Sequence, residues 1–221
     1  MVKLAFIYWL AAVAPVFAAP AAEEFSSLDA RACTTPSNSL KNPSFESNGL
    51  SSWVFTPTYA KLGSAAVVKS GYKSDHAAQI WATSGSEDPT SYNKLQQTFK
   101  ICKASRFQLS CSMLLPKDGT RYTVPRTPGM YVEVKAPDGL WYQIATFSFA
   151  SKTYTSTIFS PNKKGTHNVN EWTNFVADFP NSQTGTWTVS MEWYAMGSDA
   201  GQKASTLKVK LDNFVVKPKP A

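Results

Sequence analysis

Two glutamates on separate candidate strands are the residues whose chemistry stands out in this sequence. Glu133 lies in the segment GMYVEVK and Glu192 lies in TWTVSMEWYAM. Both alternate with apolar residues, so a sheet that buries the apolar set turns both carboxyl groups to the opposite, open face. If the two strands are neighbours, the carboxyl groups form a general acid/base pair. The alternative is that both are solvated glutamates on the surface of a strand.

The same alternation places aromatic and amide groups beside the glutamates. Tyr131 and Tyr194 occupy open positions on the same two segments, and the alternation in RFQLSCSMLL turns Gln108 outward as well. Aromatic rings stack on a sugar or on another flat apolar ligand, while amides and carboxylates orient it. We expect three further side chains at the rim of this face: Trp141, Tyr142 and Arg121.

Short strands must position these side chains, because long helical periodicity is absent and apolar and polar residues alternate in short runs. About nine such runs are bounded by Gly, Pro, Asn, Asp and Ser. Asp138-Gly139 is a typical tight turn between two of them. The pattern predicts an all-β fold, a two-sheet antiparallel β-sandwich of the jelly-roll type. Its core is expected to hold Trp53, Trp81, Trp172, Trp187 and Trp193.

The ends of the chain differ in composition from its middle. Residues 1–18 combine Lys3, an apolar run and the sequence Val-Phe-Ala, which is typical of a secretory signal peptide. A membrane helix is the weaker interpretation, because the run is short and contains Pro15. We therefore predict a secreted protein with no membrane span. Residues 19–32 are expected to be a disordered leader or pro-segment, residues 33–216 a single β-sandwich domain and residues 217–221 a flexible basic tail.

The charge of the chain does not indicate nucleic-acid binding. The formal net charge is +7, but the lysines are scattered along the sequence rather than clustered on one segment. The sequence also has no phosphate-binding loop, dinucleotide fingerprint or nucleophile elbow. We expect no nucleic-acid partner and no cofactor for catalysis, and the sequence leaves the oligomeric state open.

Three cysteines in a secreted chain predict one disulfide and one remaining thiol. Cys102 and Cys111 are close enough in sequence for a local bridge, and Cys33 is an equally good partner for either. The pairing is therefore open. A zinc site is not expected, because the sequence has no Cys-x-x-Cys motif and its two histidines lie far apart.

The order of several short motifs resembles that of carbohydrate-binding modules of the CenC or family 4/9 type. The motifs are NPSFE at residues 42–46, Gly49 and Trp53, then SGYKSDHAAQI, LQQTF, RFQLSCSML, EWTNFVADF and the closing LDNFVV. The resemblance covers nearly all of the chain after the leader. It implies a two-sheet jelly roll with a galactose-binding-like topology.

The resemblance also implies a structural calcium ion between the first turn and the last strand. Glu46 and Asp212 match the side-chain ligands, with carbonyl groups or Asp75 completing the shell. Calcium takes six to eight hard oxygen ligands and joins segments that are distant in sequence, so this ion would stabilise the fold. The alternative is that Glu46 and Asp212 cap turns or pair with lysines.

Two functions of different classes fit these features. The first is a stand-alone carbohydrate-binding module or lectin for cell-wall glycans. The second is an enzyme that works by shape, similar to the secreted fungal hetero-Diels–Alderases that couple a tropolone-type partner to a terpene. We favour the enzyme at this stage, although only narrowly, because no catalytic domain or linker to one is found in the sequence.

In the enzyme hypothesis, Tyr131, Trp141 and Tyr194 would hold two apolar partners in a reactive pose. Arg121, Gln108 or a glutamate would donate or accept a hydrogen bond at the reacting oxygen, and Glu133 or Glu192 would assist loss of water. A deep pocket would need residues 147–168 to fold over the sheet as a lid. An open groove for a glycan would need that segment elsewhere.

Overall fold

The computed structural model describes residues 38–47, 49–84, 90–102, 106–122, 127–180, 183–197 and 204–219. The predicted signal peptide, the predicted leader and Cys33 lie outside the described residues. Within these ranges, no helix is long and apolar enough to cross a membrane.

All regular elements of the described residues are strands, which confirms the predicted all-β class. In chain order they are β1 (Val54–Pro57), β2 (Gly63–Lys69), β3 (His76–Ser84), β4 (Ser91–Ile101), β5 (Phe107–Leu114), β6 (Thr120–Arg121), β7 (Gly129–Lys135), β8 (Trp141–Phe149), β9 (Thr153–Ile158), β10 (Lys163–Asn168), β11 (Trp172–Asp178), β12 (Gly185–Ala195) and β13 (Ser205–Pro218).

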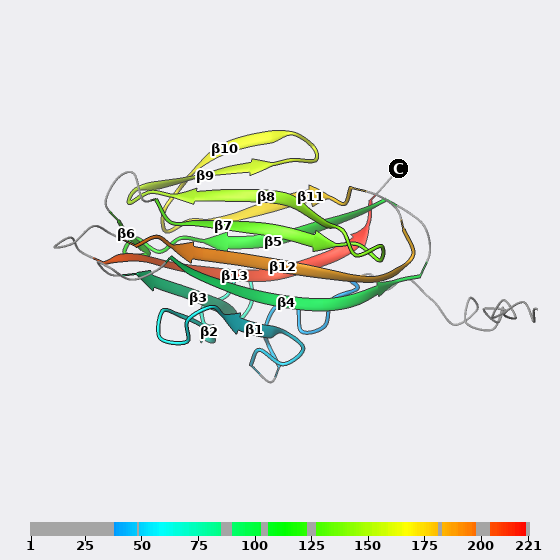
Figure 1. Ribbon diagram of the computed structural model, residues 1–221, viewed down its shortest axis with the longest axis horizontal. Coiled ribbons are helices and arrows are strands. Elements are labelled where there is room, and N and C mark those ends of the chain that lie inside the picture. Colours follow the sequence, from blue (N-terminus) through cyan, green and yellow to red (C-terminus); the bar gives the residue numbers. More distant parts are fainter. Residues whose placement is uncertain are drawn as a thin grey trace, which may run out of the picture. The chain divides into compact units, whose positions relative to one another are not determined.

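The strands form two antiparallel sheets, as the sequence predicts (Figure 1). Sheet A has seven strands in the order β1-β4-β12-β7-β8-β9-β10. Sheet B has six strands in the order β11-β5-β13-β3-β2, with β6 paired to β13. Non-consecutive strands are neighbours in both sheets, which is the pattern of a β-sandwich with crossing connections.

The core lies between the sheets, and the long central strands fill it with every second residue. On β12, Val189, Met191 and Trp193 are fully buried, and on β7 Val132 and Val134 are buried. β5, β13 and β3 contribute the facing side chains from sheet B. The side of each sheet that faces away from this core is called its outer face below. The predicted core positions on β5, β7 and β12 are confirmed.

Three of the five tryptophans predicted in the core are buried, namely Trp53, Trp187 and Trp193. The prediction is wrong for Trp81 and Trp172, which are only partly buried. On β3, Ile80 and Ala82 take the core positions, so the intervening Trp81 lies on the outer face of sheet B. The same alternation on β11 excludes Trp172 from the core.

The opening segment NPSFE packs against the last strand, β13. Phe45 and Trp53 are buried against Phe214 of β13, with ring centroids 5.1–6.0 Å apart. Asn42 has a φ of 45°, and its side chain bonds backbone groups of Ser47 and Gly49 to hold the loop. The motif therefore serves to pack the start of the domain against its last strand.

Residues 147–168 extend sheet A sideways instead of folding over it. They form the end of β8, then β9 and β10, which continue the sheet beyond β8 (Figure 1). The segment thus does not cover the outer face of β7 and β12. The lid expected for a deep pocket on that face is not formed by this segment.

Of the cysteine pairings that the sequence leaves open, the local bridge between Cys102 and Cys111 is excluded. Cys111 is a free thiol in the core, where burial raises its pKa to about 12. Its position on β5 opposite Phe175 faces the other sheet, so the thiol is a small apolar core group. Cys102 is disulfide-bonded.

Candidate binding face on the seven-stranded sheet

β12 lies between β4 and β7, so both glutamates come from neighbouring strands, as the acid/base hypothesis required. Glu192 is opposite Lys94 on one side and Tyr131 on the other. Ser190, two residues earlier, is opposite Gln96 and Glu133. All of these side chains are on the outer face of sheet A because the residues between them fill the core.

Three tyrosines form a row across this face. The Tyr194 ring lies 5.5 Å from that of Tyr92 and 5.4 Å from that of Tyr131, measured between centroids. Gly129 is opposite Tyr194 in the register, and a Cβ atom there would lie 2.3 Å from the Tyr194 hydroxyl oxygen. The absence of a side chain at residue 129 therefore lets the Tyr194 ring lie across β7. Burial, a hydrogen bond with Tyr131 and the nearby phenols raise the pKa of Tyr194, so its hydroxyl stays protonated.

Of the two glutamates beside the tyrosines, one forms an ion pair with a lysine, and the other forms none within the described part of the chain. Lys94 Nζ lies 2.7 Å from Glu192 Oε2, and the Glu192 side chain is only 16% exposed. Glu133 has no such partner among the described residues. Burial raises the pKa of Glu133, and the negative charge of Glu192 raises it further, while Lys94 partly offsets both effects. Glu192 is thus ion-paired with Lys94, and Glu133 accepts a proton more readily than an ordinary glutamate because its pKa is raised.

Further polar and aromatic groups extend the face along the strands. Gln96 Nε2 donates to Ser190 Oγ at 3.1 Å. Trp141 is 44% exposed and opposite Lys135, whose Nζ lies 5.9 Å from the indole centroid. From the Gly129 row to the Lys135 row the strand advances about 20 Å at roughly 3.3 Å per residue. We call the outer-face set the binding face; it comprises Tyr92, Lys94, Gln96, Tyr131, Glu133, Lys135, Trp141, Ser190, Glu192 and Tyr194.

Two predicted members of the site lie elsewhere, and a third cannot be placed. Gln108 is on β5 of sheet B, on the opposite side of the molecule's core, because alternation shows that a residue faces outward but not from which sheet. Tyr142 packs against the core, since adjacent residues of a strand point to opposite faces and Trp141 takes the outward position. The side chain of Arg121 is outside the described part of the structure. Their expected roles in ligand binding or catalysis stay predictions.

The sequence analysis missed the members of the binding face that lie on the second strand of sheet A, namely Tyr92, Lys94 and Gln96. They belong to β4, in the stretch SYNKLQQTF, where Asn93 and Gln97 are buried. These buried amides break the apolar-polar alternation and hide the outward set. The signal that could have found Tyr92 and Lys94 is position: they are alternate residues directly before the predicted strand LQQTF.

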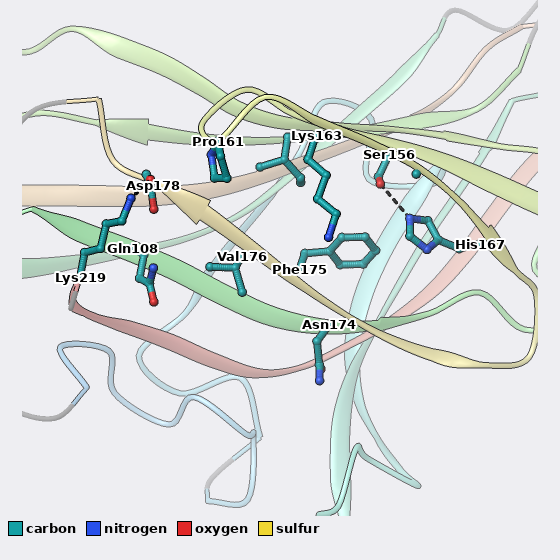
Figure 2. A pocket seen from close by; sticks show the side chains of 12 residues that line it. Gln108, Ser156, Pro161, Lys163, His167, Asn174, Phe175, Val176, Asp178 and Lys219 are labelled. Carbon is teal, nitrogen blue, oxygen red and sulfur yellow. Dashed lines mark hydrogen bonds and ion pairs between the residues drawn. The ribbon is translucent and has the colours of Figure 1, made fainter. Parts of the chain in front are cut away.

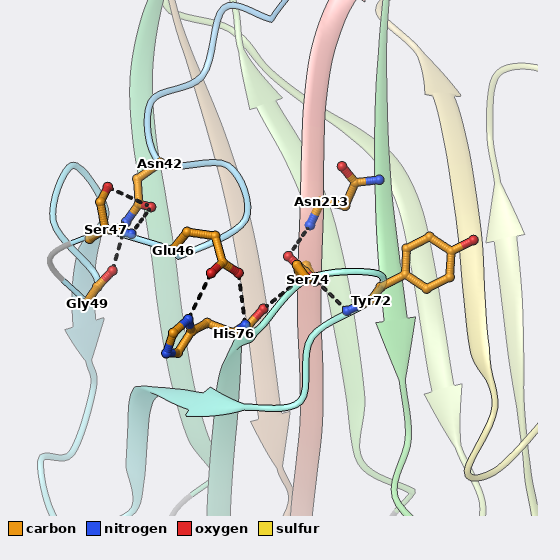
Figure 3. Close-up of polar contacts among 9 residues, drawn as sticks. Asn42, Glu46, Ser47, Gly49, Tyr72, Ser74, His76 and Asn213 are labelled. Carbon is orange, nitrogen blue, oxygen red and sulfur yellow. Dashed lines mark hydrogen bonds and ion pairs between the residues drawn. The ribbon is translucent and has the colours of Figure 1, made fainter.

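The predicted calcium ligands Glu46 and Asp212 bond to one loop, Glu46 at His76 and Asp212 at Ser74. Figure 3 shows Glu46 beside His76, with Ser74 in the same loop. The Glu46 carboxylate accepts from the His76 backbone N–H at 2.9 Å and contacts His76 Nδ1 at 2.9 Å. Asp212 is fully buried and accepts from Ser74 Oγ at 2.6 Å and from the Asn213 N–H at 2.6 Å. Asp75 belongs to the same loop, where its backbone carbonyl accepts from the Ser70 N–H, and its expected role as a ligand stays a prediction. The alternative prediction that the two carboxylates cap turns agrees with these contacts.

Burial raises the pKa of Asp212, and the charge of Glu46 raises it further, although hydrogen bonds from Ser74 and Tyr72 act against this. Gly71 allows the loop to close around the carboxylate, because a Cβ there would lie 1.9 Å from the His76 carbonyl oxygen. The donor set is therefore a buried carboxylate, a second carboxylate and a carbonyl, which are the hard oxygens that calcium takes. Among the described side chains, no group of three or more His, Cys, Asp or Glu residues is arranged to hold a metal.

Comparisons with known proteins were made by sequence and by structure. No protein-family model matches the sequence, and no curated protein matches it. Among solved structures, the carbohydrate-binding module TmCBM61 in complex with β-1,4-galactotriose is similar, with a TM-score of 0.51 and 16% identity over 82% of this chain and 99% of that one. The tandem CBM22 domain of Paenibacillus barcinonensis Xyn10C gives a TM-score of 0.49 and 14% identity over 86% of this chain and 47% of that one. A cellulose-specific module, CBM28, gives 0.44 and 12% identity over 83% and 97%. The first of these likenesses supports the fold, a β-sandwich shared with carbohydrate-binding modules.

Proposed function

We propose that this protein is a glycan-binding module and that the glycan lies along the binding face of sheet A. The row formed by Tyr92, Tyr194 and Tyr131 is the observation that carries the proposal. Sugar rings have apolar C–H faces that stack on aromatic rings, and their hydroxyl groups need hydrogen-bonding partners at the edge. This face offers both kinds of partner on neighbouring strands.

Each polar group of the face has a distinct part in this proposal. Glu192 is fixed by Lys94 and accepts from a sugar hydroxyl without moving. Glu133, whose pKa is raised, accepts from or donates to a second hydroxyl. Trp141 supplies a second stacking platform further along the strands. We assign both glutamates to orienting the ligand rather than to proton transfer.

The openness of the face supports a polymer rather than an enclosed small molecule. Residues 147–168 extend sheet A in its own plane and leave the tyrosine row uncovered by that segment. The fold likeness to a module solved with a galactotriose is in keeping with this proposal. The cycloaddition hypothesis has no support from the comparisons, so glycan binding replaces it as the main proposal. Secretion stays a proposal that rests on the sequence of residues 1–18.

We also propose that a calcium ion binds at the loop that joins Glu46 and Asp212. A fully buried carboxylate surrounded by neutral donors is costly, and a cation would offset that cost. Glu46, Asp212 and the His76 carbonyl would hold the ion. Its role would be to stabilise the fold, away from the binding face.

The test of the proposed function is retention of the protein on insoluble galactan, xylan, β-glucan, cellulose and chitin. The wild type is expected to be retained by one class of polymer, and Tyr194→Ala is expected to lose that retention. The matched control is Phe159→Ala, which removes an exposed aromatic ring outside the tyrosine row. Both variants should melt within a few degrees of the wild type, since exposed or half-exposed side chains contribute little to stability. Undiminished retention of Tyr194→Ala would place the site elsewhere.

A further inference from the structure

A pocket of about 290 Å³ lies at the open edge between the two sheets (Figure 2). Its walls come from the inward face of the β9–β10 hairpin, from β11 and from the end of β13. The hairpin belongs to sheet A and β11 is the edge strand of sheet B, so the pocket lies where sheet A extends beyond its partner. It shares no residue with the binding face.

Backbone hydrogen bonds join the two sheets at both ends of this pocket. At the end of β11, the Asp178 N–H donates to the Ser160 carbonyl at 2.6 Å. Near its start, the Asn170 N–H donates to the Leu115 carbonyl at 2.6 Å. The hairpin is thus fixed above β11 at both ends, and the pocket between them is preformed. Preformed pockets bind ligands without the cost of ordering a loop.

The floor of the pocket is apolar. Phe175 and Ile158 line it from opposite sheets, and Val176 is 44% exposed beside them. The Phe175 ring meets the His167 ring edge to face at 5.3 Å. Phe175 and Ile158 also border a small void of about 10 Å³ on the core side, so the pocket floor is continuous with the core. An apolar ligand body on this floor would remove exposed hydrocarbon from water.

One positively charged side chain faces this floor. Lys163 is opposite Ile158 in the register, and its side chain extends towards the Phe175 ring (Figure 2). Among the described residues, no carboxylate forms an ion pair with it. The carboxylate at the other end of the pocket, Asp178, is already paired with Lys219 at 2.5 Å.

The remaining titratable group of the pocket is neutral at physiological pH. Burial lowers the pKa of His167, and the nearby charge of Lys163 lowers it further. His167 Nε2 is 2.8 Å from Ser156 Oγ, which occupies one of its ring nitrogens. The pocket therefore presents an apolar floor, a neutral imidazole and one unpaired cation.

We propose that this pocket binds an amphipathic carboxylate, an aliphatic acid of medium chain length. The hydrocarbon body would lie on Phe175, Ile158 and Val176, and the carboxylate would pair with Lys163. A volume of about 290 Å³ is near the lower limit of small-molecule sites, which agrees with a ligand of this size. The proposal does not depend on glycan binding, because the two sites lie on different surfaces.

The test is calorimetric titration of the full chain with octanoate and with 1-octanol. Octanoate is expected to bind more tightly than octanol, and Lys163→Met is expected to weaken octanoate binding about threefold or more while leaving octanol binding unchanged. The matched control is Lys164→Met. Lys164 is adjacent on β10 and opposite Thr157, so its side chain lies on the other face of the hairpin.

A second variant tests the floor without disturbing the core. Val176→Glu places a carboxylate at an exposed edge position, and we expect it to abolish octanoate binding without changing the melting temperature by more than a few degrees. Absence of octanoate binding to the wild type would overturn the proposal. Equal losses in Lys163→Met and Lys164→Met would overturn it as well. Tyr194→Ala should leave octanoate binding unchanged, which separates this site from the glycan site.

Discussion

At the residue scale, Gly129 sets the position of the Tyr194 ring. Any side chain at residue 129 would overlap the Tyr194 hydroxyl and ring carbons at 2.3–2.9 Å. The φ of Gly129 is not positive, so the position needs glycine for space and not for backbone conformation. The position of the central ring of the tyrosine row therefore depends on a residue that has no side chain of its own.

We expect Gly129→Ala to weaken polymer retention nearly as much as Tyr194→Ala. The added methyl group would push the Tyr194 ring away from Tyr131 and break the row. Affinity electrophoresis of the two single variants and the double variant measures this effect. The double variant should be no weaker than Tyr194→Ala alone, because both changes act through one ring. Additive losses would show that Gly129 acts by another route.

Glu133 gives a prediction for pH. The pKa of Glu133 is higher in the folded protein than in the unfolded chain. Ionised Glu133 therefore destabilises the folded protein at neutral pH. This effect disappears at a pH low enough to protonate the group in both the folded and the unfolded state. Glu133→Gln should thus raise the melting temperature at pH 7 by up to about 3 °C, corresponding to under about 1 kcal/mol. The difference should vanish below about pH 4, near the ordinary glutamate pKa. Thermal unfolding at both pH values measures it, and a lower melting temperature of the variant at pH 7 would contradict it.

At the scale of elements, β11 packs into the core mainly through one aromatic residue, Phe175. Phe175 packs against Phe147 at 4.7 Å and against Tyr154 at 6.4 Å, between centroids. It is 7% exposed, whereas its neighbour Val176 is 44% exposed. An edge strand pairs with a neighbouring strand on one side only, so the open side of β11 is held by this packing and by the bond from the Asp178 N–H to the Ser160 carbonyl.

Phe175→Ala should lower the free energy of unfolding by about 3–5 kcal/mol, the usual cost of deleting a buried ring. The expected fall in melting temperature is roughly 6–20 °C. Val176→Ala is the matched control and should change stability by less than about 1 kcal/mol. Chemical denaturation of both variants measures the difference, and similar values for the two would mean that β11 is held in another way.

The sequence predicts strands where alternation is strong and misses those where it is weak. The predicted segments match β2, β3, β5, β7, β8, β11, β12, β13 and the second part of β4. The missed strands β1, β6, β9 and β10 are short or polar, and β10 reads KKGTHN. Such strands form because a neighbouring edge offers hydrogen bonds, which a single segment of sequence does not reveal.

Only part of the binding face could be predicted, because alternation shows which residues face outward but not which strands are neighbours. Alternation identified Tyr131, Glu133, Glu192 and Tyr194 as outward residues, and the structure brings them together. It did not identify the sheet to which Gln108 belongs, because both sheets have an outer face. Strand order is a property of long-range pairing, and the alternation within single segments does not show it.

At the scale of the whole molecule, the first described residues are fastened to the last strand. Ser39 N–H donates to the Val216 carbonyl at 3.0 Å, and Phe214 N–H donates to the Pro43 carbonyl at 3.0 Å. The proposed calcium site adds a further connection, because Glu46 and Asp212 belong to the same two segments. An ion there would stabilise the folded domain as a unit.

Calcium should raise the melting temperature of the wild type, and a chelator should reverse the change, since a ligand that binds only the folded state stabilises it. Asp212→Asn should remove this response. The matched control is Asp118→Asn, because Asp118 is 82% exposed and far from the loop in sequence. A wild type whose melting temperature is unaffected by millimolar calcium would rule out the ion and leave the turn-capping interpretation.

The central place of β13 has a consequence for biosynthesis. This strand, Ser205–Pro218, pairs with β3, β5 and β6 and also bonds the opening segment. Sheet B therefore lacks its middle strand until residues 205–218 have been made, and until then β3 and β5 each have an unpaired edge. The domain cannot complete its fold before this strand is made, and we expect folding to be slow because the pairings of β13 join segments that are far apart in sequence. During that interval the nascent chain is the state most exposed to aggregation, and it is the state on which chaperones would act.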